Sequence, residues 1–283
     1  MNISKKKDKE QRSLGPTCLS VTSYMILVFL ILPVFIIIPL SFEAQRYLEF
    51  PPRGFSLQWY KSFFTNYDWT MATWTSFKIA FFVTILATIL GTLAAFCFVR
   101  KDFRGKQLLY GFMLSPMIMP VIILAIAIYF FFAKLKLIGS VVGLIFAHTI
   151  LAVPFVIVIV TATLQGFDVN LEKAAMNLGA NRLRTFYKIT FPLIRTGVLS
   201  GALFAFLTSF DEVIIAIFIC GTTANTLPKK MWDSLTMETD PTITAIATML
   251  ITLTVTLLLF IELYRRRQIS KQTNSQIGSL SEE

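Results

Sequence analysis

Apolar residues in this chain form long runs, and polar residues are concentrated in the short segments between them. A helix of about 20 apolar residues crosses the roughly 30 Å of hydrocarbon in a bilayer, and several runs approach or exceed that length. Hydrophobic residues make up 55% of the 283 residues and charged residues only 15%, more apolar surface than a soluble domain of this size can bury. We therefore predict an all-α membrane protein whose six transmembrane helices cover residues of about 21–40, 75–99, 107–132, 141–163, 196–220 and 242–264.

The first apolar run follows a polar, basic segment at residues 1–20, an order that is also typical of a signal peptide. The run is longer than the apolar region of a signal peptide, and no small-residue cleavage site follows it. We expect it to remain as the first transmembrane helix. The chain then divides into an N-terminal tail at 1–20, a transmembrane domain at 21–264 and a C-terminal tail at 265–283.

The net charge of +10 is concentrated at the ends of the apolar runs. This placement favours lipid headgroup contacts and a role in membrane topology over nucleic-acid binding. With six spans and the N-terminus in the cytoplasm, 18 of the 26 Lys and Arg residues lie in inner segments and 7 in outer ones. The positive-inside rule then predicts that both termini and a loop at about 164–195 face the cytoplasm.

This predicted cytoplasmic loop shows the pattern of two short amphipathic helices. Asp168 or Asn170 can cap a helix that begins at Leu171, and Glu172 lies near its positive N-terminal end. Gly179 permits the left-handed turn that ends such a helix. The pattern therefore predicts a helix of about two turns at the membrane surface.

Small residues are grouped on one face of this first helix. Ala174, Ala175 and Leu178 recur at helical spacing and allow another surface to approach closely. A second amphipathic segment, residues 182–189, stops at Pro192, where the fifth span begins. The residues alone leave two interpretations open: a helix that docks onto a soluble partner, or an interfacial helix that anchors the loop to lipid.

The spacing of Ala174-Ala175, Gly179, Ile189 and Pro192 resembles the EAA loop of ABC importer permeases. The resemblance implies a type I ABC importer permease, in which the first helix of this loop is the coupling helix and sits in a cleft of the ATPase subunit. It implies a coupling function for Glu172, Lys173, Ala174, Ala175, Leu178, Gly179, Ile189 and Pro192.

Two residues depart from the family pattern. Lys173 stands where the family has a Glu directly before Ala-Ala, and Glu172 lies one place earlier. Because a helix turns by about 100° per residue, Glu172 cannot simply replace a side chain at position 173. Either that site tolerates Lys, or the ATPase cleft carries a complementary acid. Phe191 replaces the usual Leu before the proline, which is a milder change.

The resemblance also implies partners outside this chain. A separate ABC ATPase dimer is expected to bind ATP and Mg²⁺, since this sequence has no Gly-x-x-x-x-Gly-Lys-Ser/Thr loop and no cofactor or metal of its own is expected. A second permease subunit, expected to be a paralogue, completes the pore, and a periplasmic or surface solute-binding protein delivers the solute. The expected location is the bacterial inner membrane, and the expected role is transport rather than catalysis.

Three local segments resemble the spermidine/putrescine branch of these permeases. They are Phe-Ser-Leu-Gln-Trp-Tyr at 55–60, Ser-Phe-Asp-Glu-Val at 209–213, and Thr-Leu-Pro at 226–228 with Met-Trp at 231–232. The branch also resembles permeases for other small solutes. The resemblance thus implies import of polyamines or of a related small solute.

Asp211 and Glu212 lie near the middle of the predicted fifth span, where an ionised carboxylate is costly unless it is paired, protonated or hydrated. Adjacent helical residues point about 100° apart, so at most one of them faces a central pathway. A polyamine cation could pair transiently with that carboxylate. Alternatively, a carboxylate here caps a broken helix or pairs with the partner subunit. His148, the only histidine, is expected to hydrogen-bond a neighbouring helix.

Two other classes of protein fit the sequence less well. A secondary transporter of a small cationic solute, driven by an ion gradient, predicts an inverted internal repeat, and none is evident. A membrane-embedded enzyme needs a cluster of His, Asp and Glu at one membrane face, and a single histidine with scattered acids offers none. Neither class explains the loop at 164–195.

Overall fold

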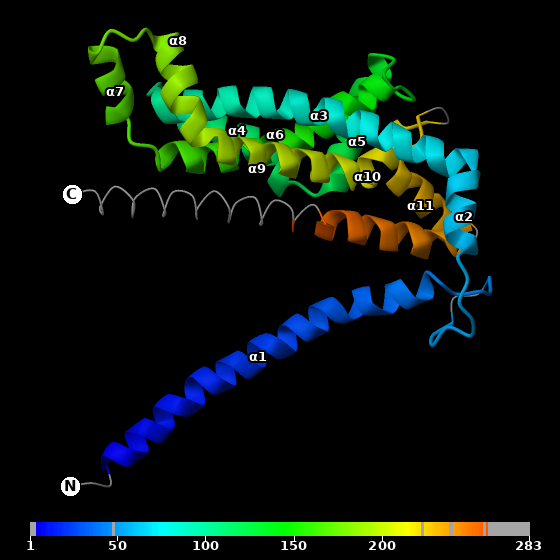
Figure 1. Ribbon diagram of the computed structural model, residues 1–283. Helices are drawn as coiled ribbons and strands as arrows, with labels where there is room; N and C mark the ends of the chain where they lie inside the picture. Colours follow the sequence, from blue (N-terminus) through cyan, green and yellow to red (C-terminus); the bar gives the residue numbers. More distant parts are fainter. Residues whose placement is uncertain (1–3, 47–48, 222–223, 238–239, 257–258, 260–283) are drawn as a thin grey trace, which may run out of the picture. The chain divides into compact units, whose positions relative to one another are not determined.

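The computed structural model describes residues 4–46, 49–221, 224–237, 240–256 and 259, and it divides into two units, residues 66–236 and residues 1–65 with 237–283. The described secondary structure is helical apart from one isolated antiparallel bridge between Glu43 and Phe55 (Figure 1). A helix satisfies all its interior backbone hydrogen bonds within one segment, which is what a hydrocarbon environment demands. The all-α prediction is confirmed.

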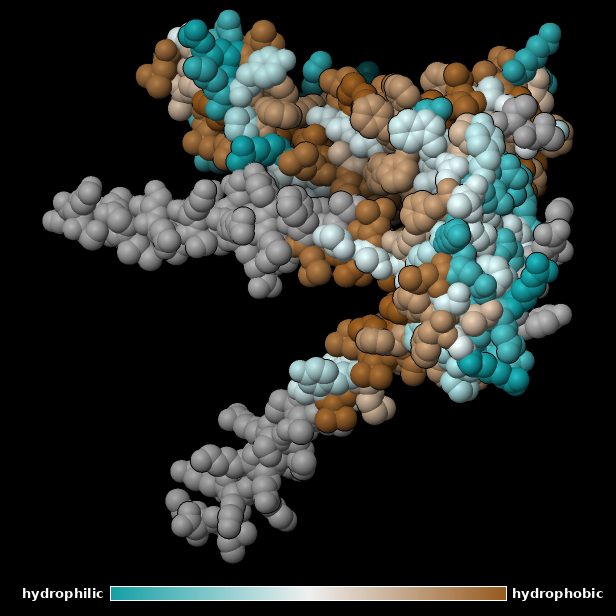
Figure 2. Space-filling view, turned by 45° about the vertical axis from the view of Figure 1, so that its right-hand side comes forward, coloured by the Kyte–Doolittle hydropathy of each residue, from teal (hydrophilic) through white to brown (hydrophobic). Residues whose placement is uncertain are grey.

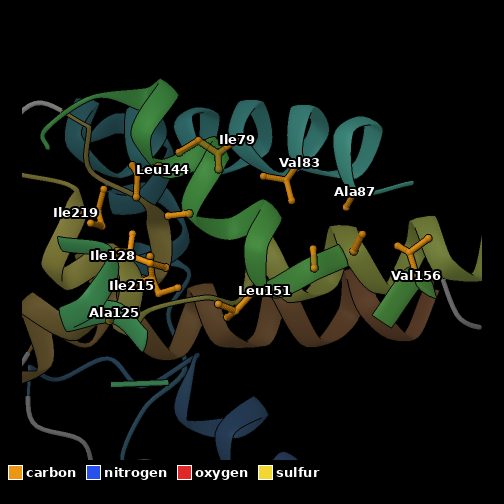
Figure 3. Packing of buried hydrophobic residues seen from close by; sticks show 14 of the residues in the cluster. Ile79, Val83, Ala87, Ala125, Ile128, Leu144, Leu151, Val156, Ile215 and Ile219 are labelled. Carbon is orange, nitrogen blue, oxygen red and sulfur yellow. The ribbon is translucent and has the colours of Figure 1, made fainter. Parts of the chain in front are cut away.

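Three long helices form the centre of the 66–236 unit: Tyr67–Arg100 (α3), Val141–Gln165 (α6) and Phe191–Phe210 (α9). All three pairs are in contact, and their facing side chains form one buried apolar cluster (Figure 3). The cluster also includes residues of two shorter helices, Val121–Lys134 (α5) and Ile214–Ile219 (α10). The predicted second and fourth spans correspond to α3 and α6.

Glycines set the close spacing of this three-helix centre. A Cβ atom at Gly91 of α3 would lie 2.6 Å from the Cβ of Val156 on α6, and one at Gly201 of α9 would lie 3.3 Å from the Cγ1 of the same valine. Gly197 of α9 is likewise in close approach to the side chain of Thr163. Small residues allow helix backbones to approach closely in membranes, where van der Waals packing drives helix association. Val156 therefore occupies space that side chains on α3 and α9 would otherwise fill.

The predicted third span is two helices rather than one. Lys106–Ile118 (α4) and Val121–Lys134 (α5) meet at a bend of 104°. Pro120 lies at the bend with φ −55° and ψ 124°, so the chain leaves the helical conformation there. A proline has no N–H for the helical ladder and restrains the residue before it, which accounts for the break. The predicted span over 107–132 therefore corresponds to a bent helix pair, and a single crossing by this pair stays a prediction.

The other unit contains Ser4–Leu40 (α1), Gln58–Thr65 (α2) and a short apolar helix, Thr242–Thr256. The apolar part of α1, Leu19–Leu40, matches the predicted first span. Among the described residues, four helices are long and apolar enough to cross a membrane, or five if the bent pair α4–α5 counts as one. The remainder of the predicted sixth span, after Thr256, lies almost entirely outside the described residues.

The surface of the 66–236 unit is strongly apolar. Figure 2 shows hydrophobic residues along the flanks of its helices and hydrophilic residues toward both ends; the end that carries Asn170–Asn177 (α7) and Arg182–Thr185 (α8) is called the polar end below. Exposed apolar flanks on long helices are what a lipid environment favours. The polar end is therefore suited to contact with water or a soluble partner.

A buried carboxylate organises the segment between α1 and α2. Glu43 is 1% exposed, and its Oε1 accepts hydrogen bonds from the backbone N–H groups of Ala44 (2.9 Å) and Gln45 (3.2 Å). Its Oε2 accepts a third from the N–H of Arg53 at 3.0 Å, ten residues along the chain. The indole N–H of Trp59 donates to the Glu43 carbonyl at 2.6 Å. One residue therefore closes the loop and joins it to α2.

We predict that Glu43→Gln loosens this loop, because an amide offers one acceptor oxygen where the carboxylate offers two. Leaving the Arg53 N–H without its partner costs about 1–3 kcal/mol. The measurement is the rate of tryptic cleavage after Arg53 in the purified full chain, followed by mass spectrometry. Glu49→Gln is the control, since it removes only the exposed Glu49–Arg53 ion pair. Equal cleavage rates in wild type and Glu43→Gln would contradict the assignment.

Candidate functional site

The first helix of the polar end, α7, begins as the sequence predicts. The Oδ1 of Asp168 accepts a hydrogen bond from the N–H of Asn170 at 2.9 Å, and Glu172 lies in the first turn. A carboxylate at this end satisfies a free N–H group and interacts favourably with the helix dipole. The predicted start at Leu171 differs from the observed one by a single residue.

The helix ends at a glycine in the left-handed conformation. Gly179 has φ +87°, and its N–H donates to the Met176 carbonyl at 3.0 Å. The N–H of Ala180 donates to the Ala175 carbonyl at 3.1 Å, which completes the hydrogen-bond pair of a Schellman motif. The predicted glycine turn is confirmed, and it fixes where the chain turns back toward α8.

The outer face of α7 is open. No residue of α7 is buried, Lys173 and Ala174 are exposed, and Leu178 just beyond its end is 88% exposed. Ala175, by contrast, is half-buried. Such a short helix with a free, small-residue face is suited to fit against another surface.

The second helix continues into the bundle instead of stopping at Pro192. α8 is followed by a π-helical turn, Phe186–Thr190 (η1), and then directly by α9. The N–H of Phe191 donates to the carbonyl of Phe186, five residues earlier. The added residue in this turn shifts the helical hydrogen-bond ladder by one residue. The shift occurs just before Pro192, which has no N–H to contribute to that ladder. The expected stop at Pro192 was wrong, because the π-turn accommodates the proline within a continuous helix.

Glu172 connects α7 to the rest of the unit. Its Oε1 accepts hydrogen bonds from Arg100 Nη2 at the end of α3 and from Thr190 Oγ1 at the end of η1, each at 2.7 Å. The residues at 172 and 173 therefore point in different directions: Glu172 contacts its own chain, whereas Lys173 is exposed. Sequence reasoning missed Arg100, which is 72 residues from Glu172 and carries no local signal of the contact.

A pocket of about 400 Å³ lies beside this contact. Its lining combines apolar side chains with the charged groups of Arg100 and Glu172, and Arg182 adds a second cation. The lining residues are Phe96, Arg100, Glu172, Met176, Arg182, Thr185, Phe186 and Thr190. The pocket thus lies between α7, the end of α3 and the α8–η1 segment.

The carboxylates predicted within the fifth span lie at a helix break. α9 ends at Phe210, α10 begins at Ile214, and Glu212 Oε1 accepts a hydrogen bond from the N–H of Ile215 at 2.9 Å. Glu212 is half-buried and caps α10, which is one of the roles left open for it. Asp211 is exposed. A role of either residue in a solute pathway stays a prediction.

His148 joins α6 to the end of α9. Its Nδ1 lies 3.0 Å from Ser209 Oγ and 3.1 Å from the Ser209 carbonyl oxygen, and the residue is 1% exposed. The predicted hydrogen bond to a neighbouring helix is confirmed. It secures the helix end that immediately precedes the break at 211–213.

A bundle of long apolar helices with a capped, polar helix pair at one end defines an integral membrane protein. The chain belongs to the family of binding-protein-dependent transport system inner membrane components, the permease subunits of ABC importers; the family model matches residues 87–270. That range contains α7, α8 and η1, so the loop on which the resemblance was based lies within the matched region. The predicted family is confirmed.

Relatives match over most of the chain. It is 32% identical over 244 residues to the spermidine/putrescine transport system permease protein PotC of Haemophilus influenzae, covering 86% of this chain and 95% of that protein. It is 33% identical over 230 residues to the putrescine transport system permease protein PotI of Escherichia coli K12, covering 79% and 82%.

A solved structure shares the fold. It is the crystal structure of a bacterial ABC transporter involved in the import of the acidic polysaccharide alginate, with a TM-score of 0.66. The match covers 90% of this chain and 97% of that chain at 15% identity. At this level of identity the similarity concerns the fold alone.

We predict that Gly179→Ala destabilises the end of α7, because an L-residue in the left-handed region costs about 1–2 kcal/mol. A Cβ at Gly179 meets nothing within 4 Å, so the cost is one of backbone conformation alone. Amide hydrogen exchange of residues 178–180 should accelerate by about five- to thirtyfold. Gly166→Ala is the control: Gly166 has φ −79° and no atom closer than 3.7 Å to the added carbon. Unchanged exchange in Gly179→Ala would contradict the prediction.

Proposed function

We propose that this chain is one of two permease subunits of an ATP-driven importer of polyamines, such as spermidine and putrescine, in a bacterial inner membrane. The observation that carries the proposal is its identity, above 30%, to permeases named for these solutes over most of both chains. The segments at 55–60, 209–213 and 226–232, which resemble the same branch, support it. No observation favours a transporter driven by an ion gradient.

In the proposed topology the chain crosses the membrane six times with both termini in the cytoplasm. The four candidate spans, the bent pair α4–α5 and the apolar helix after residue 241 supply the six crossings. The excess of Lys and Arg in the predicted inner segments, 18 against 7, supports this orientation. It places α7 and α8 on the side where ATP is available.

In the proposed mechanism α7 is the coupling helix and fits into a cleft of a separate ATPase dimer, which holds ATP and Mg²⁺. The exposure of Ala174 and Leu178 and the lack of any buried residue on α7 support this role. Closure of the ATPase dimer moves α7, and the two permease subunits then open toward a solute-binding protein outside. The second subunit is expected to be a paralogue, which is what the resemblance of the segments at 55–60, 209–213 and 226–232 to the spermidine/putrescine branch implies.

We predict that Leu178→Arg prevents the ATPase subunit from co-purifying with this chain, because a long charged side chain replaces the most exposed apolar group at the end of α7. The measurement is co-purification in detergent from cells that express all subunits. Asp102→Arg is the matched control, since it introduces the same residue at a fully exposed position in the loop after α3. If no ATPase accompanies the wild-type chain, the importer proposal fails.

Asp211 is the proposed carboxylate of the solute pathway, since it is exposed at the break whereas Glu212 caps α10. We predict that Asp211→Asn raises the apparent KM for spermidine by about two- to fivefold, the effect of a partly hydrated ion pair. Uptake of labelled spermidine by proteoliposomes containing the whole importer is the measurement. Asp68→Asn, at another exposed carboxylate, is the control. An unchanged KM in Asp211→Asn removes this residue from the pathway.

A further inference from the structure

Little apolar packing holds α7 in place. It has eight residues, none of them buried, and a helix this short is unstable in water by itself. The pocket beside it takes up part of the space between α7 and the bundle. The position of this helix must therefore depend on its caps and on the polar contacts that it makes.

Glu172 makes the polar contacts that tie α7 to two other elements. The bridge consists of Arg100, Glu172 and Thr190, and both donors bond to the same carboxylate oxygen at 2.7 Å. The side chains of Arg100 and Glu172 are only 21% and 18% exposed, and Thr190 is buried. Partial burial strengthens an ion pair of this kind relative to one on the open surface.

Arg100 is itself held in place. Its guanidinium carbon lies 5.2 Å from the ring centroid of Phe167, which precedes α7 in the chain. Arg100 occupies the last turn of α3, and Glu172 the first turn of α7. Each charge therefore lies at the helix end whose dipole favours it. The bridge joins the end of α3, the start of α7 and the π-turn that leads into α9.

We propose that Glu172 is the positioning residue through which a displacement of α7 reaches the bundle, with the Arg100–Glu172–Thr190 bridge transmitting it to α3 and, through η1, to α9. This inference rests on the proposed role of α7 as the coupling helix. It assigns the two charges at the start of α7 different tasks, since Glu172 contacts the chain's own helices and the exposed Lys173 does not.

The π-turn is the point at which this motion reaches α9. Thr190 is the last residue of η1 and lies two residues before Pro192. The hydrogen bonds of a π-turn next to a proline are displaced from the regular ladder, so this turn can shift at lower cost than an α-helical one. A pull on Thr190 therefore acts on the part of the α8–α9 helix that is easiest to move.

The test uses the whole importer reconstituted in proteoliposomes, with Glu172→Gln and Arg100→Gln as single variants. Each leaves one charge of the bridge unpaired while the exposed face of α7 is unchanged. We expect the ATPase to remain bound and to hydrolyse ATP, and the uptake of spermidine per ATP hydrolysed to fall about fivefold or more. The control is Asp102→Asn, which removes the Lys106–Asp102 pair just beyond the same end of α3 and should leave this ratio unchanged.

The double variant Arg100→Gln with Glu172→Gln separates a shared bridge from two independent effects. It removes both charges. We therefore expect its uptake per ATP to be no lower than that of the single variant with the lower uptake per ATP. Losses that multiply in the double variant would overturn the proposal. So would an unchanged uptake per ATP in both single variants.

Two further outcomes distinguish this inference from the proposed function. If the ATPase binds the wild-type chain but not Glu172→Gln, Glu172 is a docking contact and the bridge proposal is wrong. If the wild-type chain binds no ATPase, both the importer proposal and this inference fail.

Hydrogen exchange of the α7 amides in the purified full chain is a second readout. It should accelerate in Glu172→Gln and not in Asp102→Asn, and equal exchange in the two would overturn the bridge.

Discussion

The close approach of α3, α6 and α9 is the constraint on which the rest of the 66–236 unit depends. It exists because Gly91 and Gly201 leave room for Val156 of α6 between them. In hydrocarbon, where apolar side chains gain little by leaving the solvent, such packing carries much of the association energy. The ends of these helices are then fixed in space: α3 presents Arg100, and α9 begins at the π-turn. The packing of α3, α6 and α9 therefore sets the positions of Arg100 and of the π-turn, which are the two places to which Glu172 attaches α7.

Two of the three departures from a straight helix have a local hydrogen bond that satisfies the backbone. Pro120 breaks the ladder between α4 and α5, where the chain turns by 104°. Glu212 accepts the N–H of Ile215 at the break before α10, and the π-turn supplies a bond to Phe191 from Phe186. Unpaired backbone groups are costly away from water, so such breaks persist only where a partner is found.

The sequence predicted the elements of the polar end better than their connections. Gly179 and Asp168 act locally, through backbone conformation and a nearby N–H, so their spacing was sufficient to predict the turn and the cap. Pro120 and Pro192 show the limit of that reasoning: one proline bends the chain sharply, and the other is accommodated by a π-turn. Which of these happens depends on neighbouring helices. The contact between Glu172 and Arg100 depends on packing across 72 residues, and no local pattern contains it.

The same contact bears on the departure at position 173. Because Glu172 and Lys173 are about 100° apart on the helix, a change of charge at one need not disturb the contacts of the other. The Lys173 side chain is exposed and makes no hydrogen bond or ion pair with any described residue. No side-chain hydrogen bond or ion pair among the described residues therefore depends on whether position 173 is lysine or the family's glutamate. If α7 fits into an ATPase cleft as proposed, position 173 and the residues of that cleft should vary together.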